Sequence, residues 1–209
     1  MSYPNFNIEK NFTGTVIGVD EVGRGSLAGP VVSCACFFFD YSIDPSQLLL
    51  LDDSKKLTLK KRCKAFHKVY QLINDNKLRF ALGFVNVAEI DKFNIFEATR
   101  ISMKRAVQKL HCDKANLIID GKIDLQLPQY RSNGIIKGDQ KSYSIATASV
   151  IAKMHRDRYM RYLSLQHPLY NWDNNSGYGT KKHIEQIHKN GITDYHRKSF
   201  EPIKSLIHI

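Results

Sequence analysis

The stretch from residue 18 to residue 30, Gly-Val-Asp-Glu-Val-Gly-Arg-Gly-Ser-Leu-Ala-Gly-Pro, constrains the fold more than any other part of the chain. Two adjacent carboxylates, Asp20 and Glu21, follow the apolar run 15–19, which is typical of a buried strand. A loop with glycines on both sides of Arg24 comes next, and glycine lets a backbone turn tightly and approach a ligand closely. Hard divalent cations bind oxygen ligands such as carboxylates. The stretch therefore predicts a metal-binding strand end beside a loop that contacts a ligand.

The chain is strongly basic. Its 209 residues include 31 lysines and arginines against 20 aspartates and glutamates, a formal net charge of +11, and 43% of the residues are hydrophobic. This length fits one domain, which we divide into a catalytic core over residues 15–165 and a C-terminal substrate-binding extension over residues 166–209. Positive charge favours a polyanionic partner, because phosphate contacts release counterions. Charge that serves only solubility fits the composition equally well.

Neither a secretion signal nor a membrane-spanning run is found in the sequence, so we expect a cytoplasmic protein that binds no membrane. We also expect a monomer. The cysteines match no zinc-site spacing, and we expect them to be reduced and buried (Cys34, Cys36, Cys63 and Cys112).

Apolar periodicity predicts strands that first form a hairpin meander and then alternate with helices. The strands are predicted at residues 16–20, 31–39, 78–85, 117–119 and 135–136. The helices are predicted at residues 59–74, 94–110, 142–165 and 181–190, with a loop at 171–179. This order favours an α/β fold with a mixed β-sheet flanked by helices and a helical C-terminal region.

Two further acids follow or precede predicted elements: Asp120 ends a short strand and Asp139 precedes the longest helix. Carboxylates at strand ends can gather at one edge of a sheet. Four acids, Asp20, Glu21, Asp120 and Asp139, are the number expected for a site in which two divalent ions activate a water and neutralise a leaving oxygen. Asp139 as a helix cap and Asp120 in a plain turn are open alternatives.

The two adjacent acids raise a geometric difficulty. In a regular strand, Asp20 and Glu21 point to opposite faces of the sheet. Both can reach one site only if the strand bends or ends there, and Gly18 and Gly23 make a bend possible.

The loop Gly23-Arg24-Gly25 does not fit a dinucleotide fingerprint, because a strand rather than a helix follows it. Its bare amides and carbonyls suit the edge of a ligand. A sugar 2′-hydroxyl, which both donates and accepts hydrogen bonds, is the group that distinguishes RNA from DNA at such a surface. A conformational hinge explains the glycines equally well.

Other candidate substrate contacts lie farther along the chain. Lys55 and Lys56 precede the first predicted helix and could hold a phosphate, or could simply introduce that helix. Lys153 and Arg156 could steer a nucleic-acid backbone, although a solvated helix face fits them too. Tyr178, held between glycines, could stack on a base or sugar, or could be a core residue. His183 could assist proton transfer or make a local structural contact; we do not assign it a catalytic role.

Together these segments resemble ribonuclease HII, the type 2 ribonuclease H. The matching segments occur in the family's order at residues 18–25, 28–32, 53–58, 91–95, 119–121, 137–139, 149–153, 156–157, 177–180 and 196–200. Each motif is weak alone, but the ordered set is specific and covers the chain from about residue 15 onward.

The resemblance implies a ribonuclease H-like fold and an endonuclease that depends on Mg²⁺ or Mn²⁺. The implied reaction hydrolyses the RNA strand of RNA/DNA hybrids and cuts duplex DNA on the 5′ side of a single ribonucleotide, leaving a 3′-hydroxyl and a 5′-phosphate. The residues that match the family's metal-binding acids are Asp20, Glu21, Asp120 and Asp139. Those that match its substrate contacts are Gly23, Arg24 and Gly25, which read the 2′-hydroxyl, and Tyr178, near the deoxyribonucleotide after the junction.

Three features depart from the family pattern: Ser26 replaces the usual proline, Thr147 replaces a more usual alanine in the long helix, and the segment 174–176 is an unusual approach to Tyr178. The alternative function is a non-catalytic hybrid-binding module of the same fold. Four intact acids speak against it, because a pure binder gains nothing from negative charge beside phosphate.

Overall fold

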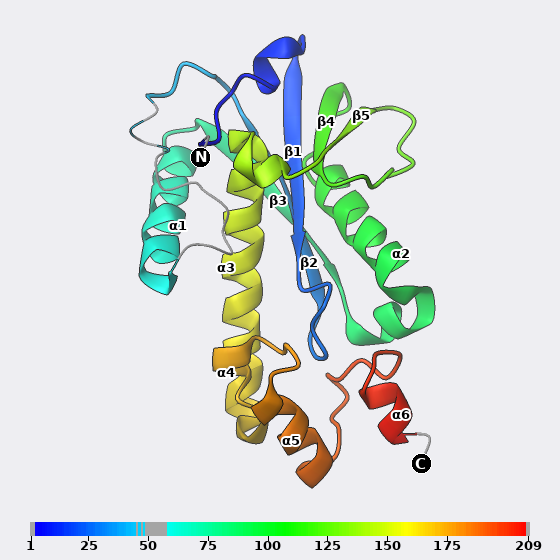
Figure 1. Ribbon diagram of the computed structural model, residues 1–209. Helices are drawn as coiled ribbons and strands as arrows, with labels where there is room; N and C mark the ends of the chain where they lie inside the picture. The colour runs from blue at the N-terminus through cyan, green and yellow to red at the C-terminus, as the bar shows by residue number, and fades with distance from the viewer. Residues whose placement is uncertain (1–2, 45, 47, 49–57, 208–209) are drawn as a thin grey trace.

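The computed structural model describes residues 3–44, 46, 48 and 58–207, and its centre is a five-stranded mixed sheet (Figure 1). The strands lie in the order β3-β2-β1-β4-β5. Their bounds are β1 Thr15–Val22, β2 Val31–Phe38, β3 Leu78–Val85, β4 Ala115–Asp120 and β5 Arg131–Ile135. β1, β2 and β3 are antiparallel neighbours, whereas β4 and β5 run parallel to β1. The predicted mixed sheet is therefore confirmed.

Helices cover both faces of this sheet (Figure 1). α1 (Leu59–Asn74) and α3 (Tyr143–Gln166) lie on one face, and α2 (Val87–Gln108) packs on the other. Three short helices follow α3: α4 (Trp172–Asn175), α5 (Lys181–Asn190) and α6 (Ile203–Ile207). Among the described residues, shorter helical turns lie at η1 (Glu9–Asn11), η3 (Gly138–Gln140) and η4 (Pro168–Tyr170). The C-terminal elements pack around the far end of α3 and the loop between β1 and β2, through a core that includes Leu27, Met160 and Trp172.

Local signals set most of the boundaries. α1 and β3 have the predicted bounds, and Thr58 caps α1 by accepting the Lys61 backbone N–H. β1 continues two residues beyond the predicted end at Asp20, because its pairing with β2 is unbroken as far as Val22. The predicted loop at 171–179 contains the single turn α4.

The long helix α3 is fixed at its beginning by an acid from the N-terminal segment. Glu9 is fully buried, and its Oε1 accepts hydrogen bonds from the Ser142 hydroxyl (2.6 Å) and from the Ser144 backbone N–H (3.0 Å). Ser142 also caps the helix by accepting the Ile145 N–H. Because helix N-termini expose unpaired N–H groups, a buried carboxylate there stabilises the helix start.

Two of the four cysteines, Cys34 and Cys36, are buried in β2, as predicted. Cys63 is exposed, so the prediction of burial is wrong for that residue, and all four are free thiols. Among the described residues, no helix is long and apolar enough to cross a membrane.

β1 and α3 approach each other closely at Gly18. A Cβ atom there would lie 2.3 Å from the backbone carbon of Ser144. We predict that Gly18→Ala lowers the free energy of unfolding by about 3 kcal/mol or more, because backbone must move to admit the methyl group. Gly14→Ala is the control: Gly14 has a positive φ but open space around it, so about 1 kcal/mol is expected. If denaturant unfolding showed that Gly18→Ala and Gly14→Ala lose the same amount of unfolding free energy, the close packing of β1 on α3 would be contradicted.

Candidate active site

The carboxylates of Asp20 and Asp120 come from two strands that run side by side. β1 and β4 are parallel with Val19 opposite Ile119, so the next residues, Asp20 and Asp120, are neighbours at the carboxyl ends of the strands. Side chains alternate along a strand, which places both carboxylates on the sheet face that α3 covers. Asp20 is 1% exposed, and Asp120 is partly exposed.

Asp139 joins them through the turn η3. The Oδ1 atom of Asp120 accepts a 2.7 Å hydrogen bond from the backbone N–H of Gly138, the residue before Asp139. Asp139 is buried and lies just before α3, whose N-terminal dipole favours negative charge. The structure thus places Asp20 beside Asp120, and it places the residue before Asp139 against Asp120; we call Asp20, Asp120 and Asp139 the acidic site.

Glu21 lies differently from the other three predicted acids. The β1–β2 register is regular from Gly18 to Val22, so the Glu21 side chain leaves the sheet on the face opposite Asp20. Its Oε1 lies 3.6 Å from the guanidinium of Arg24. The strand therefore turns only after Val22, and a shared metal site that includes Glu21 stays a prediction.

The donors at the acidic site fit a hard cation. Within the described part of the chain, no three His, Cys, Asp or Glu side chains are close enough to hold a metal ion by themselves. Mg²⁺ usually binds through one or two carboxylates and completes its shell with water and substrate phosphate oxygens. Asp20 and Asp120, neighbours at the carboxyl ends of β1 and β4, meet that requirement.

The glycine-rich loop at residues 23–30 is held from behind by Arg197. This side chain is fully buried, and its guanidinium donates to the carbonyl oxygens of Gly23 (2.6 Å), Arg24 (2.8 Å) and Gly29 (2.9 and 3.0 Å). A guanidinium offers five donors in a fixed plane, which suits several carbonyls at once. Arg197 is not among the residues predicted from the sequence, although its position within the family motif at 196–200 was an available signal.

Arg156 supports the same loop from α3. It is also fully buried and donates to the carbonyl oxygens of Pro30 (2.9 Å), Ala28 (3.0 Å) and Ser176 (2.8 Å). Burial, followed by the like charge of Arg156, lowers the pKa of Arg197 to about 9, which leaves Arg197 charged at neutral pH. The prediction of Arg156 as a phosphate contact or a solvated residue is wrong, because α3 turns it inward toward the loop.

The outer surface of this loop faces solvent. Arg24 and Gly25 are exposed, and a Cβ atom on Gly25 would lie 4.0 Å from Cε1 of Tyr178, which is 38% exposed. Gly23 has a φ of +92°, and a Cβ there would lie 2.2 Å from Nε of Arg156. The structure therefore brings the predicted loop and Tyr178 together, and it explains why Gly23 must be glycine.

Of the three lysines predicted to contact substrate, one lies within the described residues. Lys55 and Lys56 lie outside the described residues. Lys153 is described, and its ammonium is bound to Asp157 (2.6 Å) with only 14% of the side chain exposed. A contact between Lys153 and phosphate stays a prediction.

His183 belongs to a buried structural network. Its Nδ1 lies 2.9 Å from the Tyr178 carbonyl oxygen, and its Nε2 accepts from Trp172 Nε1 (3.0 Å) and lies 3.2 Å from His196 Nε2. His196 Nδ1 in turn accepts the Thr193 backbone N–H (2.9 Å). Two neutral rings satisfy every one of these contacts, with His183 protonated on Nδ1 and His196 on Nε2. These contacts support the structural reading of His183.

Ser26, the departure from the family's proline, is fully buried. Its hydroxyl has no hydrogen-bond partner among the described residues. The loop therefore keeps a buried polar group that contributes nothing to holding it in place.

Comparisons with known proteins decide which family has this arrangement. The sequence profile of ribonuclease HII matches residues 17–203. The chain belongs to the ribonuclease HII family. It is 43% identical over 208 residues to a ribonuclease HII of Wolbachia pipientis subsp. Culex pipiens, an alignment that covers 99% of this chain and 100% of that one.

Solved structures show the same fold. Ribonuclease H2 from Pyrococcus horikoshii has a TM-score of 0.76 at 24% identity, covering 93% of this chain and 98% of that one. Bst-RNase HIII in complex with Mn²⁺ has a TM-score of 0.73 at 19% identity, covering 93% and 69%. The predicted fold class is confirmed. As a ribonuclease HII family member, the chain is a metal-dependent endonuclease of the ribonuclease H type, which acts on RNA/DNA.

The histidine network makes stability depend on pH. Burial lowers the pKa of His183, and burial followed by the charge of His183 lowers the pKa of His196 to about 3. Unfolded histidine titrates near 6.5, so the unfolded chain binds more protons as pH falls below that value. We therefore predict that the free energy of unfolding falls as the pH is lowered from about 6.5 towards the folded pKa of each histidine. Each histidine should contribute up to about 1.4 kcal/mol of this decrease per pH unit.

Denaturant unfolding of the wild type, His196→Asn and His188→Gln across this range checks the prediction. The exposed His188 is the control and should keep the wild-type slope, whereas His196→Asn should show a shallower one. Identical slopes in all three proteins would mean that the network does not hold neutral imidazoles.

Proposed function

We propose that this ribonuclease HII family member hydrolyses the RNA strand of RNA/DNA hybrids and cleaves duplex DNA on the 5′ side of a single embedded ribonucleotide. The products carry a 3′-hydroxyl and a 5′-phosphate, and the reaction uses Mg²⁺ or Mn²⁺. The protein acts as a monomer. The observation that carries the proposal is the acidic site at the end of β1, directly before the loop at residues 23–30.

The carboxylates would hold the ions: Asp20 and Asp139 would hold one ion, and Asp20, Glu21 and Asp120 would hold a second. Glu21, whose side chain leaves β1 on the opposite face, would have to reach around the strand end to do so. Divalent ions in such a pair lower the pKa of a bound water and neutralise the charge that develops on the leaving 3′ oxygen. Asp120 holds its carboxylate in place through the Gly138 N–H, and Asp139 is held at the start of α3.

The loop distinguishes ribose from deoxyribose. Its carbonyls at Gly23, Arg24 and Gly29 point back to Arg197, so its backbone is fixed while Arg24 and Gly25 remain exposed. A fixed backbone can meet a 2′-hydroxyl, which donates and accepts, at little further entropic cost. Tyr178 lies beside Gly25 and packs against the next sugar.

Replacing Asp120 by Asn tests this assignment. The amide oxygen can still accept the Gly138 N–H, so the fold should persist, but the charge that attracts a divalent ion is lost. We predict that cleavage of a DNA duplex with one ribonucleotide falls on the order of 10³-fold with either ion, since bound metal contributes several kcal/mol to the barrier. Substrate binding should largely remain.

Asp113→Asn, at an exposed acid before β4, is the matched control and should cleave normally. Near wild-type cleavage by Asp120→Asn would overturn the assignment of the acidic site. Binding without turnover by the wild type, at any concentration of Mg²⁺ or Mn²⁺, would instead indicate the non-catalytic hybrid-binding module.

A further inference from the structure

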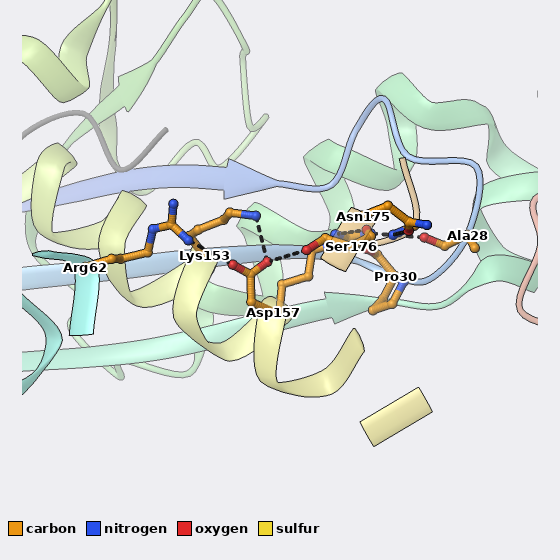
Figure 2. Close-up of polar contacts among 9 residues, drawn as sticks. Ala28, Pro30, Arg62, Lys153, Asp157, Asn175 and Ser176 are labelled. Atoms are coloured by element: carbon orange, nitrogen blue, oxygen red, sulfur yellow. Dashed lines mark hydrogen bonds and ion pairs between the residues drawn. The ribbon is translucent and has the colours of Figure 1, made fainter. Parts of the chain in front are cut away.

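The carboxylate of Asp157 joins three separate parts of the protein (Figure 2). Asp157 lies in α3, and its Oδ1 accepts from the Lys153 ammonium (2.6 Å) and from the Ser176 hydroxyl (3.1 Å). Its Oδ2 accepts from the guanidinium of Arg62 in α1 (3.0 Å). The side chains of Arg62, Lys153 and Asp157 are only 11–14% exposed, so water screens these charges weakly.

Ser176 is held at both its hydroxyl and its carbonyl oxygen. Asp157 accepts a hydrogen bond from its hydroxyl, as Figure 2 shows. The neighbouring Arg156 donates to its carbonyl oxygen (2.8 Å). Ser176 has a φ of +50°, a left-handed conformation that non-glycine residues adopt at an energetic cost. Side-chain contacts that persist at such a residue indicate that the surrounding structure imposes its conformation.

The two residues after Ser176, Gly177 and Tyr178, lie against the glycine-rich loop at residues 23–30. The Gly177 carbonyl oxygen accepts from the backbone N–H groups of Leu27 (2.8 Å) and Ala28 (3.2 Å), in the glycine-rich loop. Tyr178 comes next, and its ring lies 5.9 Å from the guanidinium carbon of Arg156. Ser176 therefore begins the short segment that places Tyr178 beside the loop at residues 23–30.

We propose that Asp157 is a positioning residue for recognition of the RNA–DNA junction: it fixes Ser176, and so Tyr178, to α3 and α1. This inference rests on the function proposed above, in which Tyr178 contacts the deoxyribonucleotide that follows a ribonucleotide. Arg62 belongs to α1, which follows Lys55 and Lys56 in the chain, so the same carboxylate couples the position of α1 to that of Tyr178.

The test compares kcat/KM for a duplex with one ribonucleotide with kcat/KM for an all-RNA/DNA hybrid. Only the first substrate always places a deoxyribonucleotide at Tyr178. We expect Asp157→Asn to lower the ratio of the two kcat/KM values about tenfold, a size typical of coupled charge networks. Ser176→Ala removes only the hydroxyl contact and should lower the ratio in the same direction by a smaller factor. Glu97→Gln, which removes the ion pair with Arg100 on α2, is the matched control and should leave the ratio unchanged.

A second measurement addresses coupling through the carboxylate. As single variants, Arg62→Met and Ser176→Ala should each lower the ratio of the two kcat/KM values. Combined with Asp157→Asn in a double variant, neither should lower that ratio further. Thermal unfolding checks that each variant is folded. If Asp157→Asn does not fold, the ratio measured for Ser176→Ala still tests the proposal.

An unchanged ratio in folded variants, or equal losses on both substrates, would overturn the positioning role while leaving the proposed function intact. A wild-type protein that cleaves neither substrate would overturn the proposed function, and this inference with it.

Discussion

Two buried guanidinium groups satisfy the inward-facing carbonyl oxygens of the loop between β1 and β2, and the arrangement of the site depends on them. Arg197 comes from the C-terminal region and Arg156 from α3, so three distant parts of the chain meet at one loop. A buried carbonyl without a donor costs about 1–3 kcal/mol, and a charged donor contributes about 1.5–3 kcal/mol per hydrogen bond. The loop backbone is held from behind by these donors, while Leu27 anchors the loop in the C-terminal core.

This arrangement separates two tasks within one short stretch of sequence. Up to Val22 the chain is a regular strand, whose pairing with β4 places Asp20 beside Asp120. From Gly23 onward it is a loop whose exposed surface, at Arg24 and Gly25, lies next to Tyr178. Acids on a strand stay fixed by the sheet, whereas the loop is fixed by arginines, so the proposed ion-binding residues and the proposed sugar-recognition surface rest on different supports.

Sequence alone predicted the elements that local signals define. The capped, periodic segment of α1 and the strand β3 have the expected bounds. Asp20 and Asp120 could be expected to be neighbours because parallel strands end at a common edge. Arg156 could not be assigned, because a charge on a helix gives no sign of which way that helix faces. Arg197, the coupling through Asp157 and the neutral histidine pair depend on contacts between residues far apart in the chain, which no local pattern encodes.

The guanidinium of Arg197 holds the glycine-rich loop. Amide hydrogen exchange in wild type and Arg197→Lys tests it directly, since lysine keeps the charge but not the planar set of donors. We predict that the amides of Leu27, Ala28 and Gly29, which are hydrogen-bonded to Gly177 and Tyr195 carbonyls, exchange at least about tenfold faster in the variant, given charged hydrogen bonds of about 1.5–3 kcal/mol. Amides of β2 at residues 34–36 should exchange as in the wild type. Unchanged protection of the loop in a folded Arg197→Lys protein would contradict the claim.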